Sequence, residues 1–320
     1  MKFVVERQID RITDAARARI AMVRPILRAT LFSMKRDRIE RLGGYGKISL
    51  ADLAREYREG PGDCGICFEY AVHDAIRNED RQVHSLVSEV LEEFCGIREG
   101  ANSILFGAEK NGAVTLIETA SDLLTDESRI LAGKTGQPPK LKRYLDRLVK
   151  AFRRPDYRER LPASIRGLWR ADLFIGSPRE DRWVATTLKI NPADLEGAPG
   201  IRIGVYPERQ RGERPSRDDG RNLILCPLPY NAGFMELFYS SFFIVRQVLA
   251  ADARVPRPVA LPSADDQHVA LELVARRDFP LLEVIEVLDP MAQPGLLESS
   301  EVGNREQQET NAVAPVPEKV

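Results

Sequence analysis

The sequence predicts an α/β fold in which a mixed central sheet is flanked by helices. Two short apolar stretches at residues 171–176 and 182–190 have the length of strands and lie at hairpin spacing. Two more strand-like stretches follow at 201–206 and 222–227, and a long apolar helix is expected at 233–251. This order of elements, with helices before and after the strands, favours a mixed sheet between helices.

Residues 1–60 are expected to form a helical N-terminal region. The segment 4–40 is rich in arginine and places apolar residues on one helical stripe, which includes Ile20, Val23, Ile26 and Leu27. Ser49 then starts a short amphipathic helix at 50–57 with a capping-type signal. For this short helix, plain helical packing is favoured over the first helix of a helix-turn-helix motif. Docking of a protein partner on the arginine-rich N-terminal helices is a separate hypothesis.

Residues 61–290 are expected to form the α/β domain. Its first helix covers 68–76, with Asp63 as the predicted N-cap. A long interval at about 80–165 separates this helix from the strand pair and is interpreted as an insertion. The insertion is expected to hold a hairpin and two helices: strands at 103–110 and 113–118 around the turn Asn111-Gly112, then helices at about 119–132 and 138–152.

The last part of the chain carries weaker signals. Prolines at 256, 258 and 262 mark a linker, after which residues 269–275 and 281–288 are expected to add a helix and a final strand. Residues 291–320 are polar and contain few large apolar groups. This composition is typical of a disordered tail.

The composition is that of a soluble globular protein, with 43% hydrophobic residues, 30% charged residues and a net charge of −1. No run of about 18 uninterrupted apolar residues occurs, so we expect no membrane span. The N-terminus becomes charged too soon for a secretory signal peptide. Four cysteines in 320 residues are too few for a disulfide scaffold. We therefore expect a cytoplasmic protein.

A lysine and a carboxylate lie on the two neighbouring strands. In the stretch 182–190 the side chains alternate, so Thr187 and Lys189 share one face. A lysine in so apolar a run must reach solvent at the strand end or meet an anion, and Asp172 is the candidate anion.

This pattern resembles the PD-(D/E)XK phosphodiesterase superfamily, the restriction-endonuclease-like nucleases. In that family an Asp ends one strand and an acid-x-Lys motif lies on the next, which corresponds here to Asp172 and to Thr187-Leu188-Lys189. Many members also carry a Glu on the first core helix, and Glu69 occupies a helix of this kind. The resemblance implies a restriction-endonuclease-like core, in which Asp172 and Glu69 bind a metal ion and Lys189 lies beside it.

The resemblance further implies metal-dependent cleavage of DNA or RNA phosphodiesters, in restriction, repair or phage defence. Mg²⁺, or Mn²⁺ in its place, needs only one or two carboxylates plus waters and a substrate phosphate, and Lys189 would stabilise the attacked phosphate. Thr187 replaces the second acid of the family, which leaves open that Asp194, Glu196, Glu180 or Asp181 supplies it. The alternative is a non-catalytic nucleic-acid-binding or assembly protein that retains the fold.

Basic residues are concentrated directly before Asp172. Residues 140–170 contain eleven Lys or Arg against three acids, with aromatic residues interleaved. Such a surface is suited to follow a phosphate backbone. The predicted nucleic-acid-binding residues are Lys142, Arg143, Arg147, Lys150, Arg153 and Arg154. A second basic stretch at 202–221 is expected to be a polar loop between strands.

Two other motifs carry less weight. Cys64 and Cys67 form a single CxxC, but it lies at the start of a predicted helix and no second CxxC exists, so buried thiols are favoured over a zinc or redox site. The run 133–135 resembles the end of a phosphate-binding loop, but it lacks the glycine five residues earlier and follows a predicted helix.

Overall fold

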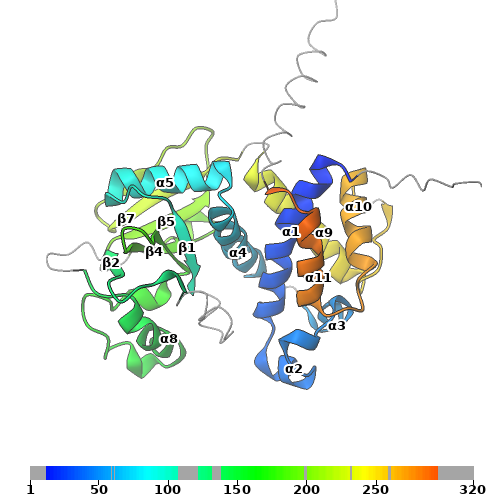
Figure 1. Ribbon diagram of the computed structural model, residues 1–320, viewed down its shortest axis with the longest axis horizontal. Coiled ribbons are helices and arrows are strands. Elements are labelled where there is room, and N and C mark those ends of the chain that lie inside the picture. The colour runs from blue at the N-terminus through cyan, green and yellow to red at the C-terminus, as the bar shows by residue number, and fades with distance from the viewer. Residues whose placement is uncertain are drawn as a thin grey trace, which may run out of the picture.

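The computed structural model describes residues 12–58, 60, 62–106, 122–131, 138–197, 200–230, 233–258 and 261–294. These residues form a mixed α/β protein whose mixed central sheet is flanked by helices, as predicted (Figure 1). The described strands of the sheet are β1 (Asn102–Leu105), β2 (Arg129–Leu131), β3 (Leu173–Ser177), β4 (Arg182–Leu188), β5 (Arg202–Pro207), β6 (Ser216–Asp218) and β7 (Leu223–Leu228).

The strand order is β1-β3-β4-β5-β7-β6. Strand β3 runs antiparallel to β1 and β4, strands β4, β5 and β7 are parallel, and β6 is antiparallel to β7. The short strand β2 pairs in parallel with the first half of β4, and β5 pairs with its second half. The predicted hairpin of β3 and β4 therefore lies near the centre of the sheet.

The two faces of the sheet are covered by different helices. Leu173, Val184 and Leu188 pack with α4 (Asp63–Arg77) and α5 (Arg81–Cys95) in one large core. Phe174, with its neighbours on the opposite face, packs in a second core with α8 (Leu145–Arg153). Side chains alternate along each strand, so residues next to each other in the sequence contribute to different cores.

Helices from both ends of the chain pack together beside the sheet (Figure 1). Helix α1 (Asp14–Ser33) contacts α4, α9 (Phe234–Ala250), α10 (Ala264–Val274) and α11 (Leu281–Leu288), and α3 (Leu50–Glu56) contacts α9. The short α2 (Arg36–Arg41) follows α1. This packing crosses the predicted boundary at residue 60, because the N-terminal helices share one core with the C-terminal ones.

The apolar stripe predicted on the N-terminal helix is buried by the chain itself. Ile20, Val23, Ile26 and Leu27 all belong to the large core. This apolar stripe is therefore not available to a protein partner. The capping signal at Ser49 is confirmed, because its hydroxyl accepts from the Asp52 N–H at 3.0 Å and the Asp52 carboxylate accepts from the Ser49 N–H.

Three predicted elements differ from the structure. Residues 281–288 form helix α11 instead of a strand, since Leu281, Val284, Ile285 and Leu288 repeat at helical spacing and all face the core. Residues 129–131, predicted as helix, form β2. Helix α4 is capped by Gly62, and the Asp63 carboxylate accepts instead from the Gly60 N–H at 2.7 Å.

Several predictions fall outside the described residues: the turn Asn111-Gly112, the strand at 113–118, the motif at 133–135 and the tail beyond residue 294. The strand predicted at 103–110 is described as β1 to Leu105. In the described part of the chain, no helix combines the length and apolarity needed to cross a bilayer.

Candidate functional site

Asp172 lies directly before β3, beside the last residues of β4. Its backbone N–H donates to the Thr186 carbonyl at 2.8 Å, which continues the ladder of the hairpin. Its carboxylate Oδ2 accepts from the Thr187 hydroxyl and from the Leu188 N–H, both at 3.0 Å. Lys189 Nζ lies 3.6 Å from the same oxygen. The expected pairing of Asp172 with Lys189 is therefore present.

The two oxygens of the Asp172 carboxylate differ in their contacts. Asp172 is only 8% exposed, and Oδ2 takes every hydrogen bond and ion-pair contact given above. No donor among the described residues bonds to Oδ1. The side chain of Lys189 is 36% exposed, so its ammonium group reaches solvent. Oδ1 is therefore the carboxylate oxygen that remains for a further contact.

Thr187 donates a hydrogen bond to the Asp172 carboxylate. It is 4% exposed, and its hydroxyl proton is directed to Asp172. Because that hydrogen is already used, only the lone pairs of the oxygen remain for another contact. Position 187 thus supplies a hydrogen-bond donor to Asp172, whereas the family pattern requires a second negative charge there.

The alternative acids are distributed over both ends of β4. Glu180 accepts from the Arg98 and Glu99 N–H groups, and Asp181 accepts from the Thr125 and Ser128 hydroxyls. Both acids precede β4, roughly 20 Å from its far end at about 3.3 Å per residue. They cannot complete a site at Asp172.

Two acids remain at the correct end of the strand. Glu196 forms an ion pair with Arg170 at 2.5 Å, and Asp194 is exposed. Both follow β4, whereas Glu69 lies on α4, which covers the opposite face of the sheet from Asp172 and Thr187. Within the described ranges, no three His, Cys, Asp or Glu side chains are close enough together to hold a metal ion.

Arg202 is a further residue near the Asp172 carboxylate, and it belongs both to the strand predicted at 201–206 and to the basic stretch at 202–221. It is the first residue of β5, is 1% exposed and donates from Nη2 to the Gly167 carbonyl at 2.7 Å. Burial lowers the pKa of its guanidinium, and the Asp172 charge opposes this shift. Alternation with Ile201 and Ile203 places Arg202 on the opposite face of β5 from these two residues, but only the tertiary structure buries that face.

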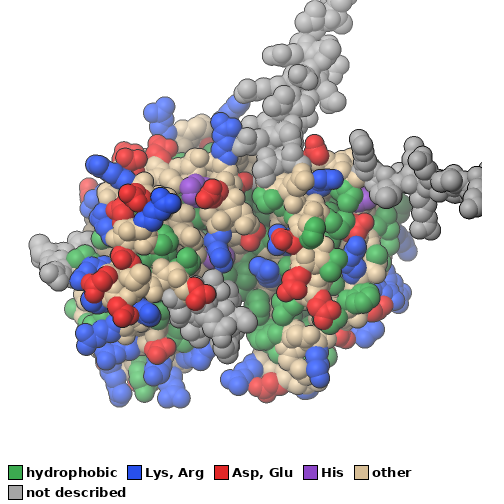
Figure 2. Space-filling view, in the orientation of Figure 1, with side chains coloured by type: hydrophobic (Ala, Val, Ile, Leu, Met, Phe, Trp, Pro, Cys, Tyr) green, Lys and Arg blue, Asp and Glu red, His purple; other side chains and the backbone are tan. Residues whose placement is uncertain are grey.

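The six predicted nucleic-acid-binding residues lie on or beside α8. Leu145, Leu148 and Ala151 face the second core, which turns the charged positions outward. All six basic side chains are exposed: Lys142, Arg143, Arg147, Lys150, Arg153 and Arg154. We call these six residues the α8 basic surface. Figure 2 shows Lys and Arg gathered at the lower left, where Figure 1 places α8.

The second basic stretch contains six arginines and four acids, and some of the acids pair with its arginines. Arg217 pairs with Asp219 at 2.7 Å, and Arg221 pairs with Asp218 at 2.6 Å. The segment contains β5 and β6, so it is partly strand and not only a loop.

The cysteines are consistent with buried thiols. All four are free, and burial raises the pKa of the Cys67 thiol to about 12. A thiol with so high a pKa is a poor nucleophile and a poor metal ligand at neutral pH. Cys64 is half-buried.

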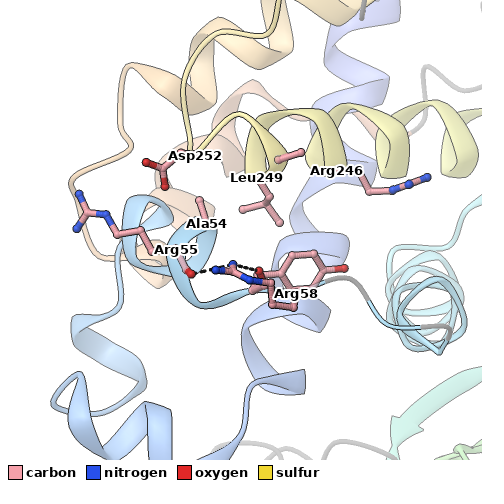
Figure 3. Close-up of a pocket in the computed structure, with 8 residues that line it drawn as sticks. Ala54, Arg55, Arg58, Arg246, Leu249 and Asp252 are labelled. Atoms are coloured by element: carbon pink, nitrogen blue, oxygen red, sulfur yellow. Dashed lines mark hydrogen bonds between the residues drawn. The ribbon is translucent and has the colours of Figure 1, made fainter.

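A cavity of about 480 Å³ lies between α3 and α9, away from the sheet. Its lining contains three arginines, one acid and apolar or aromatic residues: Arg55, Arg58, Arg246, Asp252, Ala54, Tyr57, Leu249 and Ala250. Figure 3 shows that Arg55 and Arg246 point in opposite directions, and Arg58 donates to the Arg55 and Tyr57 carbonyls. The arginines do not converge on one position, so the cavity is not organised as an anion site.

No family model, curated protein or solved structure matches this chain. The restriction-endonuclease-like resemblance therefore receives no support from a shared family or fold, and functional inference rests on the geometry of the α8 basic surface and of Asp172.

Proposed function

We propose that this protein binds nucleic acid through the α8 basic surface. The observation that carries the proposal is the amphipathic character of α8, whose apolar side is buried while its cationic side is exposed. The chain as a whole has a net charge of −1, so this positive charge is a local concentration. A phosphate backbone is the ligand that such a surface attracts.

The cations of the surface are largely available. Lys142 forms an ion pair with Asp126 at 3.4 Å. Arg143, Arg147, Lys150 and Arg154 have no ion-pair partner among the described residues. A cation without an internal partner releases condensed counterions from nucleic acid when it binds a phosphate, which makes the affinity strongly salt-dependent.

The test is fluorescence anisotropy of labelled DNA and RNA at several salt concentrations. The variant Arg147→Gln, Lys150→Gln, Arg154→Gln removes three cations of the surface that have no ion-pair partner among the described residues. Its matched control, Arg209→Gln, Arg211→Gln, Arg214→Gln, makes the same change in net charge on the second basic stretch. We expect the first variant to lower the slope of log K against log salt by about 0.7–0.9 per lost phosphate contact.

The control variant should bind nearly as wild type does. An equal loss of affinity in both triple variants would mean that only net charge matters. Absence of salt-sensitive binding in the wild type would refute the proposal.

Metal-dependent cleavage of phosphodiesters is the second candidate function. The specific observation in its favour is that Asp172 Oδ1 is open while Lys189 Nζ stands 3.6 Å from Oδ2. The donor set fits Mg²⁺ or Mn²⁺ only in part, since one carboxylate oxygen is available and the remaining ligands would be water and substrate. When bound, such an ion would polarise a phosphate and lower the pKa of a water.

In this candidate mechanism Asp172 would hold the ion through Oδ1, and the exposed Lys189 ammonium would neutralise charge on a phosphate oxygen. Arg170 is the last residue of the basic segment 140–170 and precedes Asp172 by two residues. Cleavage assays with Mg²⁺ or Mn²⁺ on wild type, Asp172→Asn and Lys189→Gln test it. Metal-dependent cutting that both substitutions abolish supports the candidate, and binding without cutting leaves nucleic-acid binding as the function.

A further inference from the structure

Aromatic rings and arginines are paired on the segment that follows α8. Arg158 lies over the Trp169 ring at 4.1 Å from the ring centre, and Arg170 lies over the same ring at 5.0 Å. Tyr157 carries two more arginines, Arg160 at 5.1 Å and Arg154 at 6.0 Å. These contacts hold guanidinium groups against aromatic faces instead of leaving them mobile in solvent.

Phe152 adds an apolar ring to the same place. Phe152 belongs to the last turn of α8 and is 38% exposed. Its ring centre lies 6.4 Å from that of Trp169. We call Phe152, Tyr157 and Trp169 with their four arginines the aromatic–arginine cluster. The cluster therefore combines an exposed ring with supported guanidinium planes and lies next to the α8 basic surface.

We infer that the aromatic–arginine cluster selects single-stranded nucleic acid by stacking with unpaired bases. The inference rests on the proposed nucleic-acid binding and deepens it. Bases of a single strand can stack on aromatic rings and on arginine guanidinium planes. In a duplex the base faces are covered by neighbouring pairs, so only the phosphates can reach the cluster.

The shape of the segment also favours single-stranded over double-stranded nucleic acid. Helix α8 has nine residues and is about 14 Å long, and the chain then continues through the short turns η3 (Pro155–Tyr157) and η4 (Leu168–Arg170). Phe152, Tyr157 and Trp169 lie at the end of the helix and on these turns, not along one helical face that could enter a major groove.

The experiment compares three labelled ligands of about 20 nucleotides: oligothymidine, a duplex, and a strand of abasic sites that has the phosphates without the bases. Anisotropy titrations use the full chain as wild type, Phe152→Ala and Phe279→Ala. Phe279 is the matched control because it is 59% exposed but lies between α10 and α11. Thermal unfolding of each variant checks that the fold is intact.

We expect wild type to bind oligothymidine more tightly than the duplex or the abasic strand. Phe152→Ala should weaken oligothymidine binding about five- to hundredfold, the range of one lost stacking contact, with little change for the other ligands. Phe279→Ala should change none of the three affinities.

Equal affinities of wild type for the three ligands, together with an unchanged Phe152→Ala variant, would overturn the inference while leaving phosphate binding intact. Failure of wild type to bind any of the ligands would instead refute the proposed function itself.

Discussion

The hydrogen bond from Thr187 to Asp172 allows the Asp172 corner to be tested without reference to any ligand. Thr187→Val keeps the shape of the side chain but removes the 3.0 Å bond to a carboxylate that is 8% exposed. A hydrogen bond to a charged group contributes about 1.5–3 kcal/mol. Because the Leu188 N–H still donates to the same oxygen, we expect a loss near the lower end, about 2 kcal/mol.

The matched control is Thr186→Val in the same strand. Thr186 is fully buried, and its hydroxyl donates to the Val184 carbonyl at 3.4 Å, a long bond between neutral groups. Its removal should cost less than about 1 kcal/mol. Urea unfolding followed by the fluorescence of the buried Trp183 on this strand measures both variants.

A double-mutant cycle with Asp172→Ala, which removes the acceptor, isolates the bond between the two side chains. We expect a coupling energy of about 1–2 kcal/mol between positions 187 and 172. A coupling below about 0.5 kcal/mol, or equal losses for Thr187→Val and Thr186→Val, would refute the interpretation that Thr187 holds the carboxylate in place.

Three further predictions concern stability and reactivity. Burial lowers the pKa of His73 to about 3, so the folded state binds fewer protons than the unfolded state. The free energy of unfolding should therefore fall by about 1.4 kcal/mol per pH unit as the pH decreases from about 6.5. Urea midpoints measured across this pH range should depend less steeply on pH in His73→Gln. Ile285→Ala should cost about 2–5 kcal/mol by calorimetry, whereas the exposed Val287→Ala should change stability by less than about 0.5 kcal/mol, and equal effects would contradict the packing of α11. A thiol reagent should modify the half-buried Cys64 first in the native protein, with Cys67 reacting only after unfolding; rapid native labelling of Cys67 would contradict its burial.

Local sequence patterns were sufficient where neighbouring residues form the contact. The strands at 173–177 and 182–188 follow each other closely, so their register could be anticipated, and with it the approach of Lys189 to Asp172. The capping box at Ser49 and the apolar stripe of α8 are likewise properties of a few consecutive residues.

Interactions between distant segments were not predictable in this way. Strand β2 has only three residues, and its state is decided by parallel pairing with β4, more than 50 residues away. The apolar run of α11 is short enough to suit either a strand or a helix, and its packing against α1 decides the outcome.

The sequence by itself determined the α/β class, the amphipathic α8 with its exposed cations, and the pairing of one carboxylate with one lysine. Only the tertiary structure decided that Arg202 is buried beside Asp172, that Glu180 and Asp181 lie at the far end of β4, and that α4 covers the opposite face. The physical reason is that periodicity assigns a side chain to one face of its own helix or strand. The burial of that side chain and its charged neighbours depend on which other elements pack against that face.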